Sequence, residues 1–388
     1  MQALVVIDDY IYSENEKSFY APYNVVVLIN RYLLSFEKVR VVARCFADLD
    51  KSNHKLIDNP RIEVFPVPMF RGVVGNLRNC RKIRNILYSS LQDIDRVILR
   101  LPSSLSFHIY SMVKKKHLKY AVEVVFDPYD AFINSDRLFD KILSFLIYYK
   151  QRGICFNADG VACVSESYLQ KRYYSKSSNS FQGSYSSIEL SRDFYSFPRK
   201  YPDKLVFSLF HSSYQIDYDG RKGHKLIIQS IAYLLKLGLD VEVIFAGEDY
   251  SNGISKLKVL AKELGVEDKV KFVGLLCNTE IRSYLLDSDL FVFPTQAEGL
   301  PRSIIEAMAV GLPCISTNVS AIPELINKEF LLDSLDYKLL ADKIYKVLSN
   351  NVVYESESSA NFEKSLAYEA SLLNNRRKCF YDKMINQK

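Results

Sequence analysis

The feature that most constrains the fold of this chain is a regular alternation of short apolar, β-branched runs with segments of helical period. In the first half, expected strands at 3–7, 39–45, 61–66, 96–101, 120–125 and 160–164 alternate with helical segments such as 23–36, 77–91 and 105–116. The second half repeats this, with expected strands at 205–210, 241–246, 271–273, 290–293 and 313–316 and helices at 224–237, 254–264, 279–286, 303–310 and 337–348. Continuous apolar strands separated by helices are typical of parallel sheets covered on both faces. The sequence therefore predicts an α/β protein with two doubly wound, Rossmann-like domains.

The domain boundaries follow from length and from a change in composition. A chain of 388 residues suits two domains better than one core. Between 171 and 204 the sequence becomes rich in Ser and Tyr and only weakly periodic, and we expect part of this segment to be the linker between the domains. We expect an N-terminal domain over 1–190, a C-terminal domain over 191–365 and a terminal helix over 366–388. Residues 361–388 read as one amphipathic helix that we expect to pack back on the N-terminal domain.

Composition narrows the class of protein. The chain is 48% hydrophobic and 25% charged, and it has no run of about 18 apolar residues, so no spanning helix is expected. The first twenty residues lack a basic segment followed by an apolar one, which predicts no signal peptide. The seven cysteines are scattered and never in CxxC spacing. This pattern predicts reduced thiols, no zinc site and a cytoplasmic protein.

Charge is uneven along the chain. Residues 1–200 carry 29 Lys and Arg against 20 Asp and Glu, whereas residues 201–388 carry 22 against 25. A basic N-terminal half fits an anionic membrane surface, an anionic substrate or an ordinary solvated face. Nucleic acid is not expected as a partner, because no RNP, KH or finger pattern is present. Basic clusters at 71–84 and 114–119 and the apolar segment LFDKILSFLIYY at 138–149 indicate either a buried helix or peripheral docking on an anionic inner leaflet.

Two glutamates flank a loop directly after the apolar run 290–293. In the segment EGLPRSIIE, Pro301 cannot lie inside a helix, so Glu298 is expected on the loop and Glu306 in the first helical turn. Gly299 lets the backbone approach a ligand closely, and the free amides of the helix start, with Arg302, make an anion site. Ligands bind at the carboxyl ends of parallel strands. The loop therefore predicts a site for a polar ligand such as a sugar joined to a diphosphate.

A local interpretation of the same residues stays open. Ser303 and Glu306 have the spacing of a capping box, in which Ser is the N-cap and Glu the third helical residue. The following GLP at 311–313 is an ordinary helix stop. Glu306 would then serve only the helix.

The longer segment EGLPRSIIEAMAVGLPCIST closely resembles the Glu-x7-Glu segment of family 4 glycosyltransferases, which are retaining enzymes of the GT-B fold. RKG at 221–223, FAGE at 245–248 and FVG at 272–274 resemble, in the right order, segments of that family around the donor diphosphate and the nucleotide pocket. The resemblance is strong over 205–326. It is weaker in the first half, where 122–130 and 164–173 look like segments of members that assemble bacterial capsule, O-antigen or exopolysaccharide. It implies two Rossmann-like domains that face a central cleft.

The resemblance also implies roles for single residues. Glu306 would bind the ribose hydroxyls of a nucleoside-diphosphate sugar, and Glu298 would contact the donor sugar. Lys222, with Arg221 beside it, would neutralise the diphosphate as it leaves. The remaining implied contacts of the nucleotide sugar are the amides of Gly299 and Leu300, the side chain of Arg302 and the strand end at Gly247.

The chain departs from the family at two places. The family usually has a Gly-Arg pair after the first strand of the second domain, where this sequence reads LFHSSYQ. Either Arg221 substitutes for that arginine, or His211 and Ser212 contact phosphate instead. The family's usual His after the strand at 121–126 is replaced by Asp127, which either contacts the donor sugar or caps a turn with Pro128.

Asp-x-Asp pairs occur at 48–50, 93–95, 217–219 and 287–289, but they lack the convergent ligands that a metal needs. We therefore expect no metal and no cofactor beyond the nucleotide-sugar donor.

The implied reaction is retaining hexosyl transfer to a glycan or lipid-linked saccharide in bacterial surface polysaccharide biosynthesis, in the cytoplasm or at the inner face of the membrane. The alternatives are a phosphorylase, a transferase with a small-molecule acceptor, and a non-catalytic sugar-nucleotide-binding or assembly-scaffold protein of the same fold.

Overall fold

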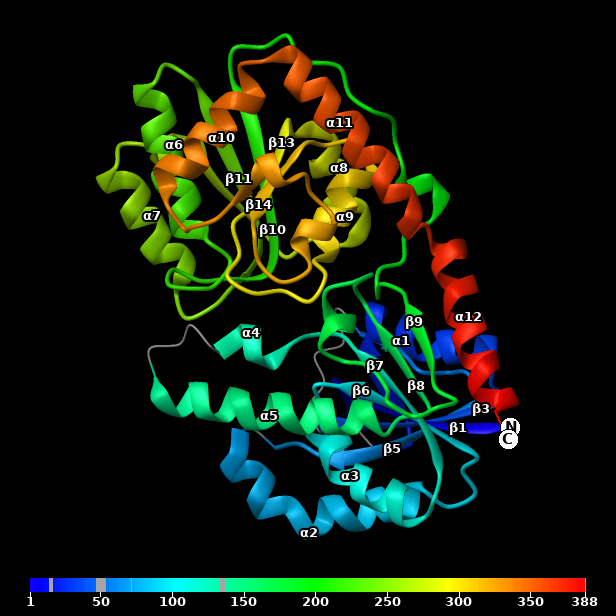
Figure 1. Cartoon of the computed structure of the whole chain (residues 1–388). Helices are drawn as coiled ribbons and strands as arrows, with labels where there is room; N and C mark the ends of the chain where they lie inside the picture. The colour runs from blue at the N-terminus through cyan, green and yellow to red at the C-terminus, as the bar shows by residue number, and fades with distance from the viewer. Residues whose placement is uncertain (14–16, 47–53, 71, 133–136, 388) are drawn as a thin grey trace. The chain divides into compact units, whose positions relative to one another are not determined.

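The computed structural model describes residues 1–13, 17–46, 54–70, 72–132 and 137–387. The chain divides into two compact units: unit 1 comprises Met1–Ser187 and Asn374–Lys388, and unit 2 comprises Ile188–Leu373 (Figure 1). The sequence-based boundary at 190 lies three residues from this division. The terminal helix is shared, because only the part from Asn374 onward belongs to unit 1.

Unit 1 is built on a parallel sheet whose strand order is β5-β3-β1-β6-β7-β8-β9. If these parallel strands alone are numbered in chain order, their order in the sheet is 3-2-1-4-5-6-7, which is the doubly wound order. The strands are β1 (Gln2–Ser13), β3 (Lys38–Phe46), β5 (Ile62–Pro68), β6 (Arg96–Leu101), β7 (Lys119–Val124), β8 (Gly160–Cys163) and β9 (Phe181–Ser184). Two short strands, β2 (Phe19–Pro22) and β4 (His54–Leu56), add an antiparallel extension at the end of β1.

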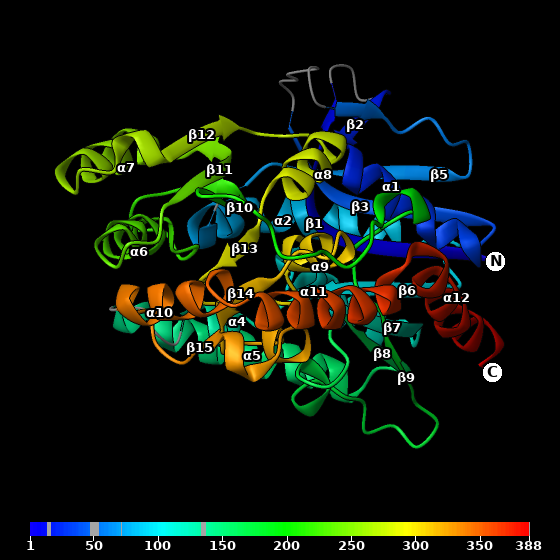
Figure 2. The ribbon, with the colours of Figure 1, turned by 90° about the horizontal axis from the view of Figure 1, so that it is seen from above.

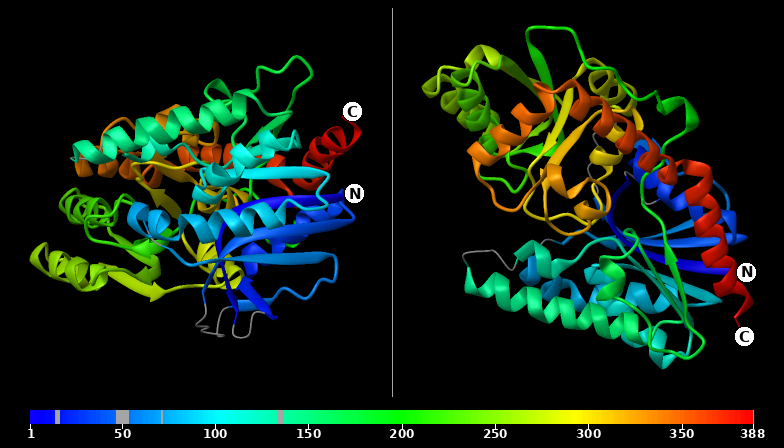
Figure 3. Two further views of the ribbon diagram at one scale, coloured as in Figure 1. Left: turned by 90° about the horizontal axis from the view of Figure 1, so that it is seen from below. Right: turned by 45° about the horizontal axis from the view of Figure 1, so that its top comes forward.

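The helices of unit 1 form two layers. They are α1 (Tyr23–Arg31), α2 (Gly72–Ser90), α3 (Ser104–Lys115), α4 (Pro128–Phe132), α5 (Leu138–Phe156) and α12 (Ala370–Asn386). α3 packs between α2 and α5 on one face of the sheet (Figure 1), and Figure 3 shows the same layer from other directions. On the other face, the Tyr381 ring of α12 lies 5.5 Å from the Tyr32 ring and 5.8 Å from the Phe36 ring.

A buried carboxylate fixes α12 in unit 1. Glu123 of β7 is 3% exposed and accepts hydrogen bonds from the hydroxyls of Tyr32 (2.7 Å), Tyr185 (2.9 Å) and Tyr381 (2.5 Å) and from Arg100 (2.9 Å). Burial alone would raise its pKa, but the Arg100 charge and the hydroxyls outweigh burial and lower it. The paired charge can stay ionised inside the unit because every partner is a donor.

Unit 2 has a fully parallel sheet of order β12-β11-β10-β13-β14-β15, which is again the doubly wound order. Figure 2 shows these strands in succession. They are β10 (Phe207–Ile216), β11 (Val241–Asp249), β12 (Val270–Gly274), β13 (Leu290–Phe293), β14 (Cys314–Thr317) and β15 (Leu331–Leu332). The helices are α6 (His224–Lys236), α7 (Gly253–Glu263), α8 (Asn278–Asp287), α9 (Arg302–Ala309), α10 (Tyr337–Leu348) and α11 (Asn351–Ser365). α6 packs with α7 and α10, whereas α9 packs with α8 and α11, as right-handed crossovers on the two faces require.

Three expectations about elements need correction. The single helix expected over 361–388 is wrong, because α11 ends at Ser365 and α12 begins at Ala370 after an extended residue, Glu369. The strand expected at 205–210 continues as β10 to Ile216, with a register irregularity between Ser212 and Gln215. Strand β9 is not expected from the sequence, and it lies within 171–204, part of which the sequence predicts to be the linker. Within the described ranges, no helix combines the length and the apolar character that crossing a membrane requires.

Candidate functional site

The topology of unit 2 places two loops next to each other. Strand order reverses at β10, so the loops that follow β10 and β13 leave neighbouring strands at the same edge of the sheet. The backbone N–H of Gln296 donates to the carbonyl of Arg221 over 2.9 Å, which joins the two loops directly. In open α/β sheets this edge is where a crevice for a ligand forms. Half of the predicted site residues in the second half of the sequence lie on these two loops, namely Arg221, Lys222, Glu298, Gly299 and Leu300. The others lie on the neighbouring elements: His211 and Ser212 in β10, Gly247 in β11, and Arg302 and Glu306 in α9.

Lys222 and Glu298 form an ion pair across these loops. The Lys222 ammonium also lies 5.2 Å from the centre of the Phe293 ring, at the end of β13. Both side chains are partly buried, with 33% of Lys222 and 17% of Glu298 exposed. A half-buried ammonium with one carboxylate partner remains a strong donor for a further anion.

Two glycines are required by the close packing around these loops. Gly223, the residue before α6, has φ = 76°, and a Cβ there would lie 2.4 Å from the carbonyl oxygen of Pro294. Gly247, at φ = 153°, would place a Cβ 2.3 Å from the carbonyl oxygen of Ser213. A side chain at Gly223 would push the loop after β10 away from the loop after β13, and a side chain at Gly247 would push β11 away from β10. Gly247 therefore allows β11 to pack closely against the C-terminal part of β10.

The start of α9 is free of side-chain caps. Pro301 is the N-cap and no side chain accepts from the first turn, so the capping box of Ser303 and Glu306 is not formed and that interpretation is wrong. The first amides of such a helix have no partner within the helix. Gly299 and Leu300 before it are buried, and Arg302 is exposed. Burial raises the pKa of Glu306, with the Arg302 charge acting in the opposite direction.

His211 lies inside β10, not at its end. The ring is fully buried, its Nδ1 is 2.8 Å from the carbonyl oxygen of Val292, and it stacks on Phe293 at 5.3 Å. Burial and the neighbouring His224 hold the pKa of His211 well below its ordinary value. His224 is likewise buried, its pKa is lowered to about 4, and its Nε2 lies 3.2 Å from Ser213 Oγ. The two imidazoles are therefore neutral near pH 7 and offer hydrogen bonds without charge.

Ser212 is half-buried at the register irregularity of β10, and Arg221 is exposed on the following loop. Their contact with phosphate stays a prediction.

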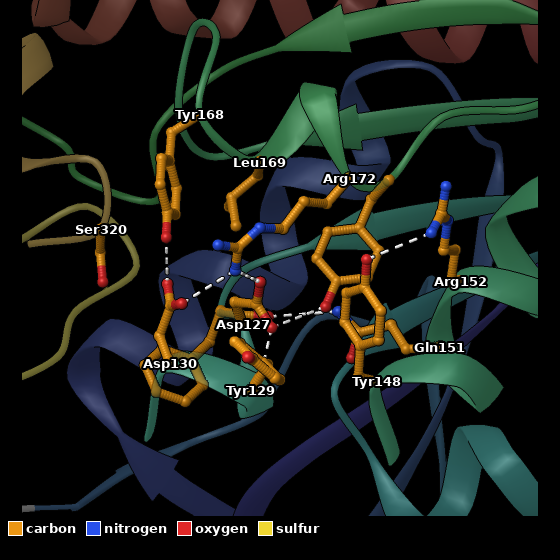
Figure 4. A network of polar contacts seen from close by, with 12 residues as sticks. Asp127, Tyr129, Asp130, Tyr148, Gln151, Arg152, Tyr168, Leu169, Arg172 and Ser320 are labelled. Carbon is orange, nitrogen blue, oxygen red and sulfur yellow. Dashed lines mark hydrogen bonds and ion pairs between the residues drawn. The ribbon is translucent and has the colours of Figure 1, made fainter. Parts of the chain in front are cut away.

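Asp127 lies in unit 1, in the network shown in Figure 4. Its carboxylate is fully buried, accepts from Tyr129 N–H (2.9 Å) and Tyr173 Oη (2.7 Å), and pairs with Arg172. Arg172 also donates to Asp130 over 2.8 Å. Burial raises the pKa of Asp127, and the bonds from Arg172 and Tyr173 oppose that rise. The bond to Tyr129 caps the start of α4, as the turn-capping alternative requires. A contact of Asp127 with the donor sugar stays a prediction.

The structure adds residues that the sequence did not single out. Ser320 Oγ accepts from the backbone N–H of Glu298 over 3.3 Å, and Phe293 faces Lys222. Ser320 has φ = 51°, a conformation that nothing in its local sequence signals.

Among the described residues, no group of three or more His, Cys, Asp or Glu is arranged to hold a metal ion. The Asp-x-Asp pair at 48–50 lies outside those residues. The absence of a metal stays a prediction.

Sequence comparisons with known proteins cover the segment that carries these loops. Residues 216–366 match the family model "Glycosyl transferases group 1", so the two loops and α9 lie inside the matched segment. Protein CapJ of Staphylococcus aureus is 28% identical over 349 residues, which cover 87% of this chain and 84% of CapJ. The capsular polysaccharide biosynthesis glycosyltransferase CapM of the same species is 26% identical over 226 residues, 55% of this chain and 58% of CapM.

Solved structures of similar fold cover nearly the whole chain. Sucrose-phosphate synthase from Thermosynechococcus elongatus aligns with a TM-score of 0.74 at 15% identity, covering 99% of each chain. Anabaena HepE in complex with UDP and glucose aligns with a TM-score of 0.68 at 15% identity, covering 98% of this chain and 99% of HepE. At this identity the likeness concerns the fold, and that fold is GT-B.

Proposed function

We propose that this chain, which carries a glycosyltransferase group 1 domain in a GT-B fold, is a retaining glycosyltransferase of family 4. It would move a hexose from a nucleoside-diphosphate sugar to a glycan of the bacterial surface. The observation that carries the proposal is the Lys222–Glu298 pair beside the uncapped start of α9. A cation, an acceptor carboxylate and free amides there match the diphosphate and the hydroxyls of a nucleotide sugar.

The nucleotide half of the donor would be recognised by Glu306 and by the edge of the sheet. A carboxylate accepts two hydrogen bonds from a ribose diol, and the partial burial of Glu306 strengthens such bonds by excluding water. Gly247 lets the end of β11 pack closely against the C-terminal part of β10. Ser212 and neutral His211 would supply hydrogen bonds on the phosphate side, where Arg221 supplies charge.

The transferred sugar and the leaving diphosphate would meet between Glu298 and Lys222. Glu298 would accept from sugar hydroxyls, while the amides of Gly299 and Leu300 and the side chain of Arg302 face the phosphates. As the anomeric bond breaks, negative charge grows on the diphosphate, and the fixed Lys222 ammonium would stabilise that charge. No side chain is assigned as a covalent nucleophile. The donor is a substrate, and the mechanism requires no other cofactor.

The acceptor is proposed from the relatives. CapM is named for capsular polysaccharide biosynthesis, and an amylovoran biosynthesis glycosyltransferase, AmsK of Erwinia amylovora, is 37% identical over 112 residues, 27% of each chain. We therefore propose a growing, lipid-linked saccharide as the acceptor, bound by unit 1 at the cytoplasmic side of the membrane.

The experiment that tests the donor site is a thermal-shift screen without metal, using UDP-, GDP-, ADP- and CMP-sugars. UDP-sugars are tested first, because HepE was solved with UDP. A ligand that binds only the native state raises the melting temperature by mass action, so one nucleotide class should stand out. Glu306→Ala should abolish that rise. Glu263→Ala, on the exposed side of α7, is the matched control and should leave it unchanged.

The ligand that binds is then used to measure transfer. Binding that survives Glu306→Ala would overturn the site assignment. The non-catalytic alternative would be favoured by two results together. Glu306→Ala would lose donor binding, and the unaltered protein would show neither hydrolysis nor transfer when acceptors from capsule-type glycans are supplied.

A further inference from the structure

Helix α5 of unit 1 exposes a continuous row of large apolar side chains. The six residues are between 42% and 72% exposed, and they are Leu138, Phe139, Ile142, Phe145, Leu146 and Tyr149. Their spacing follows the helical period, so at about 100° per residue all six fall within roughly 120° of the helix circumference. We call this row the α5 stripe. Scattered exposed apolar residues are ordinary, but a contiguous row on one helix face marks an interaction surface.

The opposite face of α5 is buried within unit 1, so the residues of the α5 stripe are not part of the hydrophobic core. Ser144, Gln151, Ile154 and Cys155 are buried, and Gln151 Nε2 donates to the carbonyl oxygen of Phe126 over 3.2 Å. Gly153 continues the line of the stripe, and a Cβ there would meet nothing within 4 Å. The helix is therefore anchored by one face and leaves the opposite face open.

The charged residues of α5 that flank the stripe are all basic. Lys141 and Arg152 lie along one edge of it on the helical period, and Lys150 lies along the other. The only acidic residue of α5, Asp140, lies on the opposite side of the helix. The Lys150 ammonium is 5.0 Å from the Phe107 ring of α3, which holds that cation beside the stripe.

The neighbouring helices extend the basic surface. α2 carries four basic residues and α3 carries two, and neither helix has an acidic residue. All six are exposed, namely Arg78, Arg81, Lys82, Arg84, Lys114 and Lys115. α2, α3 and α5 belong to one layer (Figure 3). An apolar row bordered by cations is complementary to a bilayer that carries anionic headgroups.

We propose that unit 1 docks on an anionic lipid bilayer through the α5 stripe, with the helix lying in the plane of the membrane surface. The leucine, isoleucine and aromatic side chains enter the boundary of the acyl chains, and the flanking lysines and arginine contact phosphate groups. This goes beyond the proposed transfer reaction and does not depend on it, because lipid binding needs neither donor nor acceptor. It would bring the enzyme to a lipid-linked acceptor.

The chain has no tryptophan, so a single introduced tryptophan reports on its own surroundings. We would place it at Leu146→Trp in the stripe and, as the control, at Val352→Trp on α11, since both positions are highly exposed (64% and 72%). With vesicles of phosphatidylglycerol and phosphatidylcholine, emission of Leu146→Trp should shift to shorter wavelength. Emission of Val352→Trp should not change. No shift at Leu146→Trp, or equal shifts at both positions, would overturn the proposal.

Vesicle sedimentation of the full chain tests the stripe without a fluorophore. Phe139→Ser with Leu146→Ser should lower the partition coefficient about tenfold, because two exposed apolar groups are lost. Phe197→Ser with Leu205→Ser, at 78% and 91% exposed positions of unit 2, should not lower it. Lys141→Glu should lower it roughly fivefold or more on anionic vesicles, and by less on phosphatidylcholine alone.

A second copy of this chain is the competing occupant. Sedimentation velocity distinguishes a dimer from membrane docking. The membrane assignment would be overturned if the unaltered chain were a dimer that does not bind vesicles, and if Phe139→Ser with Leu146→Ser converted that dimer to a monomer. Circular dichroism of each variant checks that the fold is retained. Donor binding in the thermal-shift screen is read separately, so failure of membrane docking and failure of the proposed function give different results.

Discussion

Lys222 and Glu298 come from loops that follow the first and the fourth strands of the unit 2 sheet, and their side chains form an ion pair at the edge where strand order reverses. The pair holds the ammonium in place before any ligand arrives. A cation that is already fixed needs no reorganisation when a diphosphate leaves, and such preorganisation is the main source of electrostatic catalysis. Glu298 therefore has two roles in the proposal: it orients Lys222 and it contacts the donor sugar.

Lys222→Met tests the electrostatic role. The methionine keeps the length of the side chain and removes its charge, so kcat should fall about 100-fold or more while the fold is retained. Lys225→Met is the matched control. Lys225 lies on α6, its ammonium lies over the Tyr218 ring, and the proposal does not place it at the diphosphate. Steady-state transfer with the identified donor measures both. A kcat within twofold of the unaltered enzyme in Lys222→Met would contradict the assignment.

Gly223→Ala should disturb the same site through the backbone. The added Cβ meets the Pro294 carbonyl at 2.4 Å and the residue is at positive φ, so we expect a loss of about 3 kcal/mol in stability and a lower kcat. Gly238→Ala is the control, since its φ is 82° but a Cβ there meets nothing within 4 Å. It should cost only about 1 kcal/mol. Urea denaturation compares the two, and equal losses would show that packing against Pro294 does not matter.

The sequence predicted the parts of the site that one segment carries. Glu298 on the loop and Pro301 directly before α9 could be predicted from residue types, because these signals are local. Glu306 lies one turn later than predicted, because α9 begins at Arg302 and Glu306 is its fifth residue. The Ser320 contact to Glu298 could not, because it joins residues 22 positions apart through a serine in an unusual conformation. The burial of His211 was also missed: β10 continues through its irregularity, and the sequence indicated a strand that ended before it.

The two doubly wound sheets were likewise predictable, since buried parallel strands read as apolar runs. β9 was not, because its sequence, FQGS, is polar and only its pairing with β8 makes it a strand. The break between α11 and α12 is another tertiary effect. Helical period continues across Leu366–Tyr368, but Tyr381 must reach Glu123 in unit 1, and the extended Glu369 redirects the chain.

Asp127→Asn separates a structural from a catalytic role. Asparagine cannot pair with Arg172, so we expect the free energy of unfolding to fall by about 2 kcal/mol. Tyr173→Phe removes one hydrogen bond to the same carboxylate and should cost about 1 kcal/mol. Kinetics are then measured at a temperature where both variants are folded. A kcat of Asp127→Asn well below that of Tyr173→Phe would support contact with the donor sugar, whereas equal values would assign Asp127 to the α4 turn alone.

Glu357 on α11 should make stability depend on pH. It is 5% exposed, its Oε2 has no hydrogen-bond partner in the described part of the chain, and burial raises its pKa to about 7 from an ordinary 4.5. Because the pKa of Glu357 is higher in the folded state, the protonated carboxyl group contributes to the stability of the fold. This contribution is fully present below about pH 4.5 and is lost as the pH rises through 7. Glu357→Gln should therefore be more stable than the unaltered chain by on the order of 2 kcal/mol at pH 8 and no more stable at pH 4.5. Urea denaturation across this range measures the difference, with Glu363→Gln at an exposed position of the same helix as the control. A difference that stays constant from pH 4.5 to 8 would show that Glu357 does not titrate in this way.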